Sequence, residues 1–465
     1  MFFEIEKKNP GSAAAISDTG DILSYGQLMA FTEEFCGHIA HRTLLFILCR
    51  NCMGALKGYV SCLSGHIVPL LLDAGLDGEL LEGLIRTYRP EYLWLPQERG
   101  QAFSWPVRFA ADGYVLLKTD YKAYEMHPDL GLLLTTSGST GTAKLVRQSY
   151  ANMEANARSI LSYLELNEKE RPVTSLPMSY TYGLSVINSH LLAGATILLT
   201  GKSLMEQGFW QFAKDRAATS LAGVPYTYEM LKKLRFFRMD LPSVKTLTQA
   251  GGALPLQLHR EFAEKCAEKG IRFYVMYGQT EATARMSYLP WQRSLEKSGS
   301  IGIAIPGGRL SLIDEEGREI GIPGQIGELV YEGPNVTMGY ALTVEDLVRG
   351  DLWKGRLLTG DLARFDEEGY YYIAGRKKRF LKLYGKRVNP DECESLLRDH
   401  FGIECACAGR DDLLGVFLTD GDMADICCEY LAEKLGMTSS AFTARILPEI
   451  PKNEAGKIQY KDLVL

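Results

Sequence analysis

The chain has 465 residues, of which 46% are hydrophobic and 23% are charged, so it is a globular protein too long for a single hydrophobic core. Two or three domains are therefore expected. The 51 Lys and Arg residues are outnumbered by 57 Asp and Glu residues, and the resulting net charge of -6 excludes a strongly basic surface and disfavours a nucleic acid as partner.

Simple sequence patterns predict the cellular location of the protein and the redox state of its cysteines. The first ten residues carry acids where a signal peptide would be apolar, and no run reaches about 18 uncharged apolar residues. We therefore expect a soluble, cytoplasmic protein without a membrane span. The ten cysteines are expected to be reduced and buried. Cys49 and Cys52 form a C-x-x-C pair, but the second pair that a zinc site needs is missing.

The first part of the chain alternates helical patterns with short apolar runs, which is typical of βα units. The helical patterns are Tyr25–Ile39, Met53–Leu63 and Gly78–Tyr88, and the apolar runs are Leu44–Leu48, Ile67–Leu72 and Tyr92–Leu95. A passage from Pro96 to Gly113, rich in turn-forming residues, is expected to be irregular.

A buried strand, Gly131–Leu134, then leads into a loop of hydroxyls and glycines that ends at a lysine. Its residues are Thr136, Ser137, Gly138, Ser139, Thr140, Gly141, Thr142, Ala143 and Lys144. Small residues let consecutive backbone N–H groups surround an anion, so the loop is predicted to bind phosphate. Its spacing differs from G-x-x-x-x-G-K-[ST], which disfavours a mononucleotide kinase or GTPase. A flexible surface loop is the alternative.

The βα alternation resumes after this loop and is then replaced by a pattern of short strands between turns. Further strands are expected near Val173–Leu176, Thr196–Thr200, Ser220–Gly223, Val244–Ala250 and Arg272–Tyr277, which predicts an α/β fold with a doubly wound, largely parallel sheet. After Glu281, short runs between turn signals predict a small β-rich subdomain, with strands at Arg309–Ile313, Gly327–Tyr331 and Tyr370–Ile373. The basic run Arg376–Arg379 precedes a terminal α+β piece.

Five stretches in this order resemble the signature of the adenylate-forming superfamily, which includes acyl-CoA synthetases, firefly luciferase and the adenylation domains of nonribosomal peptide synthetases. They are Thr136–Lys144, Tyr277–Glu281, Gly327–Tyr340, Thr359–Leu362 with Gly375–Arg376, and Leu381–Pro390 with Gly456–Lys457. The resemblance implies a large N-terminal domain at 1–377, with an α/β core at 1–285 and a β-rich subdomain at 286–377. A small mobile C-terminal domain at 378–465 would carry the catalytic lysine.

The chemistry accounts for these residue types independently. A carboxylic acid with a pKa of about 4 to 5 is already ionised at neutral pH, so its attack on the α-phosphate of ATP needs no general base. The enzyme must instead hold two anions together and neutralise the developing charge. Hydroxyls, glycines, cations and a Mg²⁺ ion are therefore expected, and a Ser-His-Asp triad is not.

The resemblance assigns a role to each motif residue. The loop Thr136–Lys144 would hold the β- and γ-phosphates, Thr280 would contact the α-phosphate, and Glu281 would bind Mg²⁺. Asp361 would accept from both ribose hydroxyls, with Arg376 beside it. The remaining nucleotide-binding residues would be Ala250, Gly251, Gly252, Ala253, Tyr277, Gly278 and Gln279. Taken alone, Glu281 could be a solvated acid and Asp361 a turn residue.

The C-terminal motifs imply two catalytic poses. Lys457 would place its ammonium on the oxygens between carboxylate and α-phosphate during adenylation. Lys378 would be the hinge whose rotation moves Lys457 out and brings in the loop for thiol transfer, with Lys382 in that loop. Gly385 would leave room for the pantetheine arm. A lone C-terminal lysine or a lysine in a basic run is ordinarily solvent-exposed.

The acyl pocket is expected at Tyr180, Thr181, Tyr182, Gly183 and Ser185, with 250–252 and 274–278 beside it. Tyr180 replaces a pocket histidine common in acyl- and aryl-CoA ligases, and Ala143 replaces a proline. No aspartate near Thr181 is placed to pair with an α-amine, and an unpaired ammonium in a dry pocket is costly. Amino acids are therefore disfavoured as substrates, and fatty or aromatic acids remain open.

The sequence thus predicts an ATP- and Mg²⁺-dependent acid–thiol ligase that forms an acyl-adenylate. It then transfers the acyl group to CoA or, in trans, to the phosphopantetheine of an acyl carrier protein. Two alternatives remain: a stand-alone adenylation enzyme for an amino or hydroxy acid, and a non-catalytic nucleotide-binding protein. Retention of Glu281, Asp361 and Lys457 argues against the second.

Overall fold

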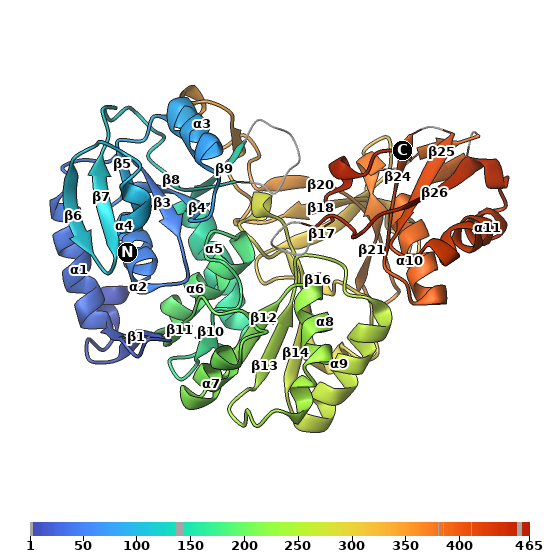
Figure 1. Cartoon of the computed structure of the whole chain (residues 1–465), viewed down its shortest axis with the longest axis horizontal. Coiled ribbons are helices and arrows are strands. Elements are labelled where there is room, and N and C mark those ends of the chain that lie inside the picture. Colours follow the sequence, from blue (N-terminus) through green and yellow to red (C-terminus); the bar gives the residue numbers. More distant parts are fainter. Residues whose placement is uncertain (1–2, 136–143, 380, 385, 411, 453–457) are drawn as a thin grey trace.

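The computed structural model describes residues 3–135, 144–379, 381–384, 386–410, 412–452 and 458–465. Two large mixed sheets with their helices form the N-terminal part of the molecule, and a smaller four-stranded sheet lies between them and the C-terminal part (Figure 1). The mixed α/β fold predicted from the sequence is confirmed, although the strands are divided between two large sheets rather than gathered in one.

The first sheet runs in the order β16-β15-β14-β13-β12-β10-β11-β1-β2 in the described chain. Its bounds are β1 Ala13–Ser17, β2 Ile22–Ser24, β10 Pro172–Val173, β11 Ile197–Leu199, β12 Ser220–Gly223, β13 Thr246–Gln249, β14 Arg272–Tyr277, β15 Ser287–Leu289 and β16 Ile303–Ala304. The strands from β1 through β11, β10, β12 and β13 to β14 are parallel, and antiparallel partners close both edges.

The second sheet runs in the order β19-β9-β8-β4-β3-β5-β7-β6. Its bounds are β3 Leu44–Cys49, β4 Val68–Asp73, β5 Tyr92–Pro96, β6 Val107–Ala111, β7 Tyr114–Lys118, β8 Leu130–Thr135, β9 Leu145–Ser149 and β19 Tyr340–Ala341. Strand β8 is the predicted strand before the phosphate-binding loop, and it pairs antiparallel with β9 on the far side of that loop. Residues on both sides of the loop are therefore fixed in one sheet.

The passage from Pro96 to Gly113 was expected to be irregular, and that prediction is wrong. It contains the short helix α4 Gln97–Gly100 and the edge strand β6, which pairs antiparallel with β7. Asp112 and Gly113 both have positive φ, 49° and 73°, and make the tight hairpin turn between β6 and β7. Apolar residues lie on both sides of this edge strand, because Val107 and Ala110 are exposed while Phe109 and Ala111 are half-buried, so the sequence shows no clear alternation.

Helices cover both faces of each large sheet. They are α1 Tyr25–Gly37, α2 Met53–Ser64, α3 Gly78–Tyr88, α5 Tyr150–Leu164, α6 Thr181–Ala193, α7 Gln207–Asp215, α8 Pro225–Lys233 and α9 Leu256–Lys269. Helices α7, α8 and α9 pack on the outer face of the first sheet, α3 packs on the outer face of the second, and α1, α2 and α6 lie between the sheets. This is the doubly wound arrangement that the βα alternation predicts.

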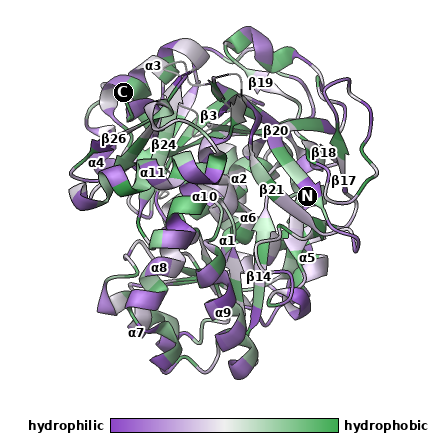
Figure 2. Cartoon of the chain, turned by 90° about the vertical axis from the view of Figure 1, so that its right-hand side faces the viewer, coloured by the Kyte–Doolittle hydropathy of each residue, from purple (hydrophilic) through white to green (hydrophobic). Residues whose placement is uncertain are grey.

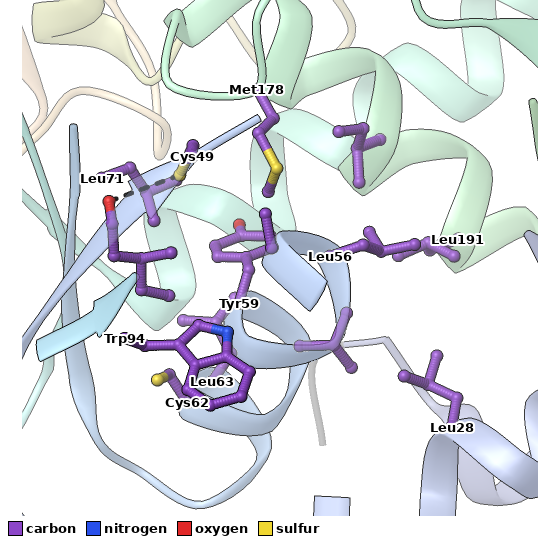
Figure 3. Packing of buried hydrophobic residues seen from close by; sticks show 14 of the residues in the cluster. Leu28, Cys49, Leu56, Tyr59, Cys62, Leu63, Leu71, Trp94, Met178 and Leu191 are labelled. Atoms are coloured by element: carbon purple, nitrogen blue, oxygen red, sulfur yellow. Dashed lines mark hydrogen bonds between the residues drawn. The ribbon is translucent and has the colours of Figure 1, made fainter. Parts of the chain in front are cut away.

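The two sheets share one core, which passes through α2 and α6 (Figure 3). Leu56 and Leu191 face each other across it, and the Tyr59 hydroxyl donates to Asn188 Oδ1 at 2.8 Å. Cys49 and Cys62 are buried in the same cluster. Burial raises the pKa of both thiols, so these cysteines act as small apolar core residues.

The four-stranded sheet and the C-terminal part follow. The sheet runs β17-β18-β20-β21, with bounds β17 Arg309–Ile313, β18 Gly327–Glu332, β20 Arg356–Phe365 and β21 Tyr371–Arg376. The C-terminal part contains β22 Leu381–Leu383, β23 Lys386–Val388, α10 Pro390–Phe401, β24 Cys405–Arg410, β25 Leu413–Leu418, α11 Ala424–Leu435 and β26 Phe442–Ile446. It has its own apolar core between the β24-β25-β26 sheet and the two helices.

The surface follows ordinary hydropathy. Figure 2 shows hydrophilic residues along the outer helix α9, while the apolar residues of that helix turn to the first sheet. Within the described residues, no helix is both long enough and apolar enough to cross a lipid bilayer.

A prediction tests the core at α2. Alanine at Gly58 would place its Cβ 2.3 Å from Trp94 Cδ1, so Gly58→Ala should lower the free energy of unfolding by about 1 to 3 kcal/mol through overpacking. Gly83→Ala is the matched control, because Gly83 lies inside helix α3 with no atom within 4 Å of the added Cβ. It should raise stability by about 0.5 to 1 kcal/mol in chemical denaturation. Equal stability of the two variants would contradict the packing described here.

Candidate functional site

The parallel strands β12, β13 and β14 end along one edge of the first sheet. The loop 250–253 follows β13, and the loop 278–281 follows β14. Their side-by-side register places these two predicted nucleotide-binding loops next to each other. In open α/β sheets, the crevice beyond the carboxyl ends of parallel strands is where ligands bind.

The loop after β14 is held by close backbone contacts. A Cβ at Gly278 would lie 1.6 Å from the carbonyl oxygen of Ala284, so only glycine fits at this position. Thr283 and Ala284 have positive φ, 62° and 146°. The Asn335 side chain fixes the turn by donating from Nδ2 to Ala282 O at 2.8 Å. Strain and buried hydrogen bonds thus define the orientation of Thr280 and Glu281, which lie on the 3-10 turn Thr280–Ala282.

Asp361 is the centre of the first polar cluster and is 3% exposed. It lies directly opposite Arg376 in the β20–β21 ladder, and Arg376 Nε lies 2.7 Å from Oδ1. The other oxygen, Oδ2, accepts from the Tyr277 hydroxyl and from Gln279 Nε2. Three predicted nucleotide-binding residues, from β14, the following loop and β21, therefore converge on the carboxylate of a fourth, in β20.

Burial dominates the ionisation of this cluster. It raises the pKa of the Asp361 carboxyl above its ordinary value, and the positive charge of Arg376 opposes that rise. Burial also keeps the pKa of the Tyr277 phenol well above its ordinary value, so this hydroxyl remains a donor to Asp361. The cluster holds a carboxylate at an energetic cost, which is common at functional sites and uncommon in structural cores.

A second polar cluster surrounds Glu281. The Tyr340 hydroxyl donates to Glu281 Oε1 at 2.6 Å, and the Lys144 ammonium lies 3.9 Å from the centroid of the Tyr340 ring. Trp353 packs edge-on against the same ring. Tyr340 thus connects the predicted Mg²⁺ ligand Glu281 with the lysine that closes the phosphate-binding loop. Only Oε1 of Glu281 is engaged among the described residues, and Oε2 is left to serve as a hard ligand.

Sequence reasoning assigned no role to Tyr340 or Trp353. Tyr340 is the last residue of the Gly327–Tyr340 motif, and that position was the available signal. The β19–β9 ladder brings it to Lys144, because Tyr340 is the register partner of Val146. Trp353 lies in a loop with no motif, so only the fold reveals it.

The loop 250–253 is held in place by contacts with Gln249 and Tyr180. Gln249 is buried and donates from Nε2 to Gly252 O at 2.9 Å. Gly251 has a φ of 84°, and a Cβ there would lie 2.5 Å from the Tyr180 hydroxyl oxygen. Gly251 therefore lets the predicted adenine-side loop contact the predicted acyl pocket directly.

The predicted acyl-pocket residues lie at the start of α6. The buried Tyr182 has its hydroxyl 2.8 Å from Thr248 Oγ1, and Ser185 Oγ donates to Tyr182 O at 2.7 Å. A Cβ at Gly183 would lie 2.2 Å from Pro177 O, so glycine is required where the helix meets the preceding turn. Thr181 Oγ1 is buried and has no hydrogen-bond partner among the described residues. Burial raises the pKa of Tyr180 to about 12, so this phenol is neutral.

Eight of the predicted site residues lie in parts of the chain that the structure does not describe. Thr136, Ser137, Gly138, Ser139, Thr140, Gly141, Gly385 and Lys457 lie outside the described residues. Lys378 lies in the 3-10 turn Lys377–Arg379, and Lys382 lies in β22. Their predicted roles as hinge and thiol-transfer residues stay predictions.

The described residues that flank Lys457 approach the nucleotide side. Lys452 and Ile458 form an isolated β-bridge. The Lys452 ammonium lies 5.7 Å from the ring centroid of Tyr226 at the start of α8. The preceding Pro225 lies against Gly252, where an added Cβ would be 3.1 Å from its ring. The C-terminal part therefore contacts the N-terminal part beside the loop 250–253.

Comparison with known proteins identifies the family. Residues 2–341 match the sequence model of the AMP-binding enzyme family. The chain belongs to this family. The resemblance to the adenylate-forming superfamily is thereby confirmed, and so, at the level of this family, is the prediction of an AMP-forming acid–thiol ligase.

Sequence similarity to individual relatives extends over much of the chain. It is 27% identical to indoleacetate–CoA ligase of Aromatoleum aromaticum, over 98% of this chain and 95% of that protein. It is 30% identical to a long-chain-fatty-acid–CoA ligase of Escherichia coli, over 74% and 63% of the two chains. Among solved structures, O-succinylbenzoate CoA synthetase of Bacillus subtilis in complex with AMP superposes with a TM-score of 0.81 at 22% identity, covering 99% and 97%. That synthetase has also been solved with ATP and magnesium ion.

A prediction tests Asp361 in this AMP-binding enzyme. Asp361→Asn keeps the shape and removes the charge, so the KM for ATP should rise about 10- to 100-fold, from the loss of a hydrogen bond to a charged acceptor, with a smaller change in kcat. Steady-state kinetics with varied ATP measures this. An unchanged KM for ATP would contradict a contact with the nucleotide.

The same variant has a defined pH signature. Because the folded pKa of Asp361 is raised, its contribution to stability is complete below the unfolded pKa and is lost as pH rises through the folded pKa. Asp361→Asn should therefore melt at the same or a higher temperature than the wild type at pH 7 to 8. Any advantage should shrink as pH falls toward 4. A variant that melts several degrees lower at pH 8 would contradict the raised pKa.

Proposed function

We propose that this chain activates a carboxylic acid as its acyl-adenylate with ATP and then transfers the acyl group to CoA. The carrying observation is the pair of clusters around Asp361 and Glu281, which share the short loop 278–281 because Gln279 belongs to the first and Glu281 to the second. One cluster suits the ribose and the other the phosphates and their metal ion. Fatty and aromatic acids are the proposed substrates, in keeping with the acids named for the relatives.

Asp361 is proposed as the ribose acceptor. Its Oδ2 already accepts two hydrogen bonds and its Oδ1 pairs with Arg376, so ribose hydroxyls would replace some of these donors. Tyr277 and Gln279 therefore keep the buried carboxylate satisfied when no nucleotide is bound. Arg376 is half exposed and would then be available for the nucleotide.

Glu281 is the proposed Mg²⁺ ligand. Its carboxylate is held through one oxygen by Tyr340, and a cation, Lys144, lies on the other side of that ring. This donor set fits a hard divalent ion next to a polyphosphate. The bound ion would neutralise phosphate charge as pyrophosphate departs. Lys144 would supply a further positive charge to the β- and γ-phosphates.

The acid needs no base in this site. Its carboxylate is ionised at neutral pH, and the chain would have to hold it near the α-phosphate and screen the repulsion between the two anions. Neutral Tyr180 and the backbone at Gly251 would form the floor on the acyl side. Thr280 and the ammonium of Lys457 are proposed to stabilise the charge that develops at the α-phosphate.

The thiol step remains a proposal of two poses. We propose that the chain divides at Lys378 into a domain at 1–377 and a mobile domain at 378–465, and that rotation there exchanges Lys457 for the segment with Lys382 and Gly385. The separate apolar core of the C-terminal part supports this division. CoA is preferred to a carrier protein as acceptor. The ten free cysteines agree with a reducing compartment, and the cytoplasm is the proposed location.

A pyrophosphate-release screen tests the function. Fatty, aryl and amino acids are supplied with ATP and Mg²⁺, first with CoA and then with a phosphopantetheinylated carrier protein. Acid-dependent pyrophosphate and thioester with CoA are the expected results. Activity confined to amino acids would favour a stand-alone adenylation enzyme, and no adenylate with any acid would favour a non-catalytic nucleotide-binding protein.

A prediction separates the two half-reactions. Lys457→Ala should lower the rate of adenylate formation by about 100- to 1,000-fold through loss of charge stabilisation. Thioester formation from a supplied acyl-adenylate and CoA should change less than about threefold. Lys461→Ala, at an exposed position of the same terminal segment, is the matched control. Equal losses in both half-reactions would refute the two-pose assignment.

A further prediction concerns the metal ion. Glu281→Gln can still accept a hydrogen bond from Tyr340 but loses its charge, so the Mg²⁺ concentration for half-maximal pyrophosphate release should rise about tenfold or more. Glu345→Gln, an exposed acid in the segment after Tyr340, is the control and should leave the Mg²⁺ titration unchanged. An identical titration for Glu281→Gln would exclude Glu281 as a ligand.

A further inference from the structure

Arg285 is a buried cation that contacts the segments predicted to form the acyl pocket. It is 2% exposed, and within the described part of the chain its hydrogen bonds leave from Nε and Nη1 alone. Nε donates to Ser185 Oγ at 3.2 Å, and Nη1 donates to the Tyr163 hydroxyl at 3.1 Å and to Met276 Sδ at 3.3 Å. The guanidinium also lies 5.2 Å from the ring centroid of Tyr182. Three of these four neighbours belong to the segments expected to line the acyl pocket.

The partners of Arg285 are all neutral. Among the described residues, no carboxylate forms an ion pair with it, and no acceptor is hydrogen-bonded to Nη2. A fully buried guanidinium that is incompletely satisfied is costly. Arg147 provides the comparison, because it is also buried but donates to three backbone carbonyls, of Met338, Arg349 and Gly350, which anchor the loop before Trp353. Arg147 is a structural arginine, although its Nε is also buried without a partner among the described residues. Arg285 differs because no carbonyl or carboxylate oxygen in the described part of the chain accepts from it.

A narrow cavity adjoins Arg285 between α6 and the first sheet. Its walls include Arg285, His190, Thr248 and Ala222, and it leaves about 10 Å³ for the centre of a water molecule, which is room for one oxygen atom. His190 donates from Nδ1 to Val186 O, and its Nε2 is buried with no partner among the described residues. Burial lowers the pKa of His190 to about 4, so the ring is neutral and adds no second positive charge beside Arg285.

One acid also lines this cavity. Glu170 is buried at its far end, where Oε2 accepts from the Thr219 hydroxyl at 2.5 Å. It makes no ion pair with Arg285 within 4.0 Å. A water-mediated contact between Glu170 and Arg285 is therefore the competing arrangement, in which the guanidinium has a purely structural role.

The cavity extends along β12 and β13 from their amino ends, and Thr248 and Ala222 are its lining residues nearest the proposed reaction site. Side chains alternate along a strand, so Thr246 and Thr248 of β13 face the same side as Ala250, which opens the loop 250–253. Ala222 of β12 lines the cavity beside them. Thr248 precedes Ala250 by two residues, which is about 7 Å along a strand. A short acid with its reacting carboxylate at the loop 250–253 would thus reach Arg285 with its distal end.

We propose that Arg285 is a specificity-determining residue that selects a short acid carrying a second carboxylate at its distal end. This inference rests on the proposed acid activation and specifies its substrate class. The distal carboxylate would accept from the free Nη2, and one of its oxygens would occupy the water-sized space near Thr248. Carboxylate and guanidinium form charge-assisted hydrogen bonds, which neither an alkyl chain nor an unsubstituted aryl ring can offer.

The same geometry excludes long apolar acids. A fatty chain that extended past Tyr182 would place methylene groups against the buried guanidinium of Arg285 and leave its Nη2 without an acceptor. The site would therefore reject an analogue that lacks the polar group much more strongly than an apolar pocket rejects an extra methylene. Arg285 would thus narrow the fatty and aromatic acids of the proposed function to dicarboxylic acids of about four to six carbons and aromatic acids with a second carboxylate of similar reach.

Matched acid pairs test the proposal. Butanedioate with butanoate, pentanedioate with pentanoate, and hexanedioate with hexanoate are compared by kcat/KM for pyrophosphate release in the wild type, Arg285→Met, Arg285→Lys and Arg147→Met. At least one diacid should exceed its monoacid by about tenfold or more in the wild type. Arg285→Met should abolish or reverse that ratio, Arg285→Lys should retain part of it, and Arg147→Met should leave it unchanged. Melting temperatures of all variants are recorded alongside.

Calorimetric titration of the same acids into the protein with AMP provides a readout independent of turnover. Binding of a diacid that Arg285→Lys weakens, with no binding of its monoacid, supports the proposal. The proposal is overturned if the enzyme uses both members of every pair equally and Arg285→Met lowers both activities by the same factor. Arg285→Lys replaces Arg285→Met in this comparison if the methionine variant does not fold. Arg285 would then have a structural role. If monoacids release pyrophosphate and no diacid does, the inference fails while the proposed function stands. If no acid releases pyrophosphate, the proposed function fails, and the titration alone decides the binding claim.

Discussion

The site depends on one buried carboxylate. Asp361 is 3% exposed and remains acceptable to the fold because Tyr277 and Gln279 at the end of β14, and Arg376 at the end of β21, bring donors to it. Those donors in turn fix the ends of β14 and β21 relative to β20. The four-stranded sheet is thereby tied to the carboxyl edge of the first sheet, which is where the proposed nucleotide position lies. The contacts of this one carboxylate therefore connect two sheets at the place where the proposed ribose contact lies.

Backbone contacts that only glycine permits complete the arrangement. Gly278 allows the turn to fold back on Ala284, Gly251 allows its loop to reach Tyr180, and Gly183 allows α6 to begin against Pro177. Each removes a side chain where two segments must approach closely. The glycines of the motifs therefore serve tertiary contact as well as ligand access. The same close approach places Tyr182 and Ser185 where Arg285 can contact them both.

The two ends of the proposed pocket differ in polarity. Toward the nucleotide, Tyr180 and the loop 250–253 present neutral groups and backbone, and at depth Arg285 presents a cation without a carboxylate partner among the described residues. Such a gradient suits an acid with charge at both ends better than one with an apolar tail. The C-terminal part contributes at the opposite rim, where Lys452 lies over Tyr226. A ligand between these limits would be enclosed by both parts of the chain.

The sequence alone determined the family signature and most of the elements, because hydrophobic periodicity and motif order are local properties. Helix α3 and strands β12 and β14 have the predicted bounds, and the motifs alone predict nucleotide binding by Asp361, Arg376, Tyr277 and Gln279, which the fold brings together. Edge strand β6 is not predicted by the sequence, because its exposed residues Val107 and Ala110 are apolar and obscure the alternation. Only the tertiary structure decided that Tyr340 connects Glu281 with Lys144, and that Arg285 is buried without a counter-ion among the described residues. Both facts arise from residues brought together by strand pairing and helix packing across long stretches of chain, and no local pattern encodes such a contact.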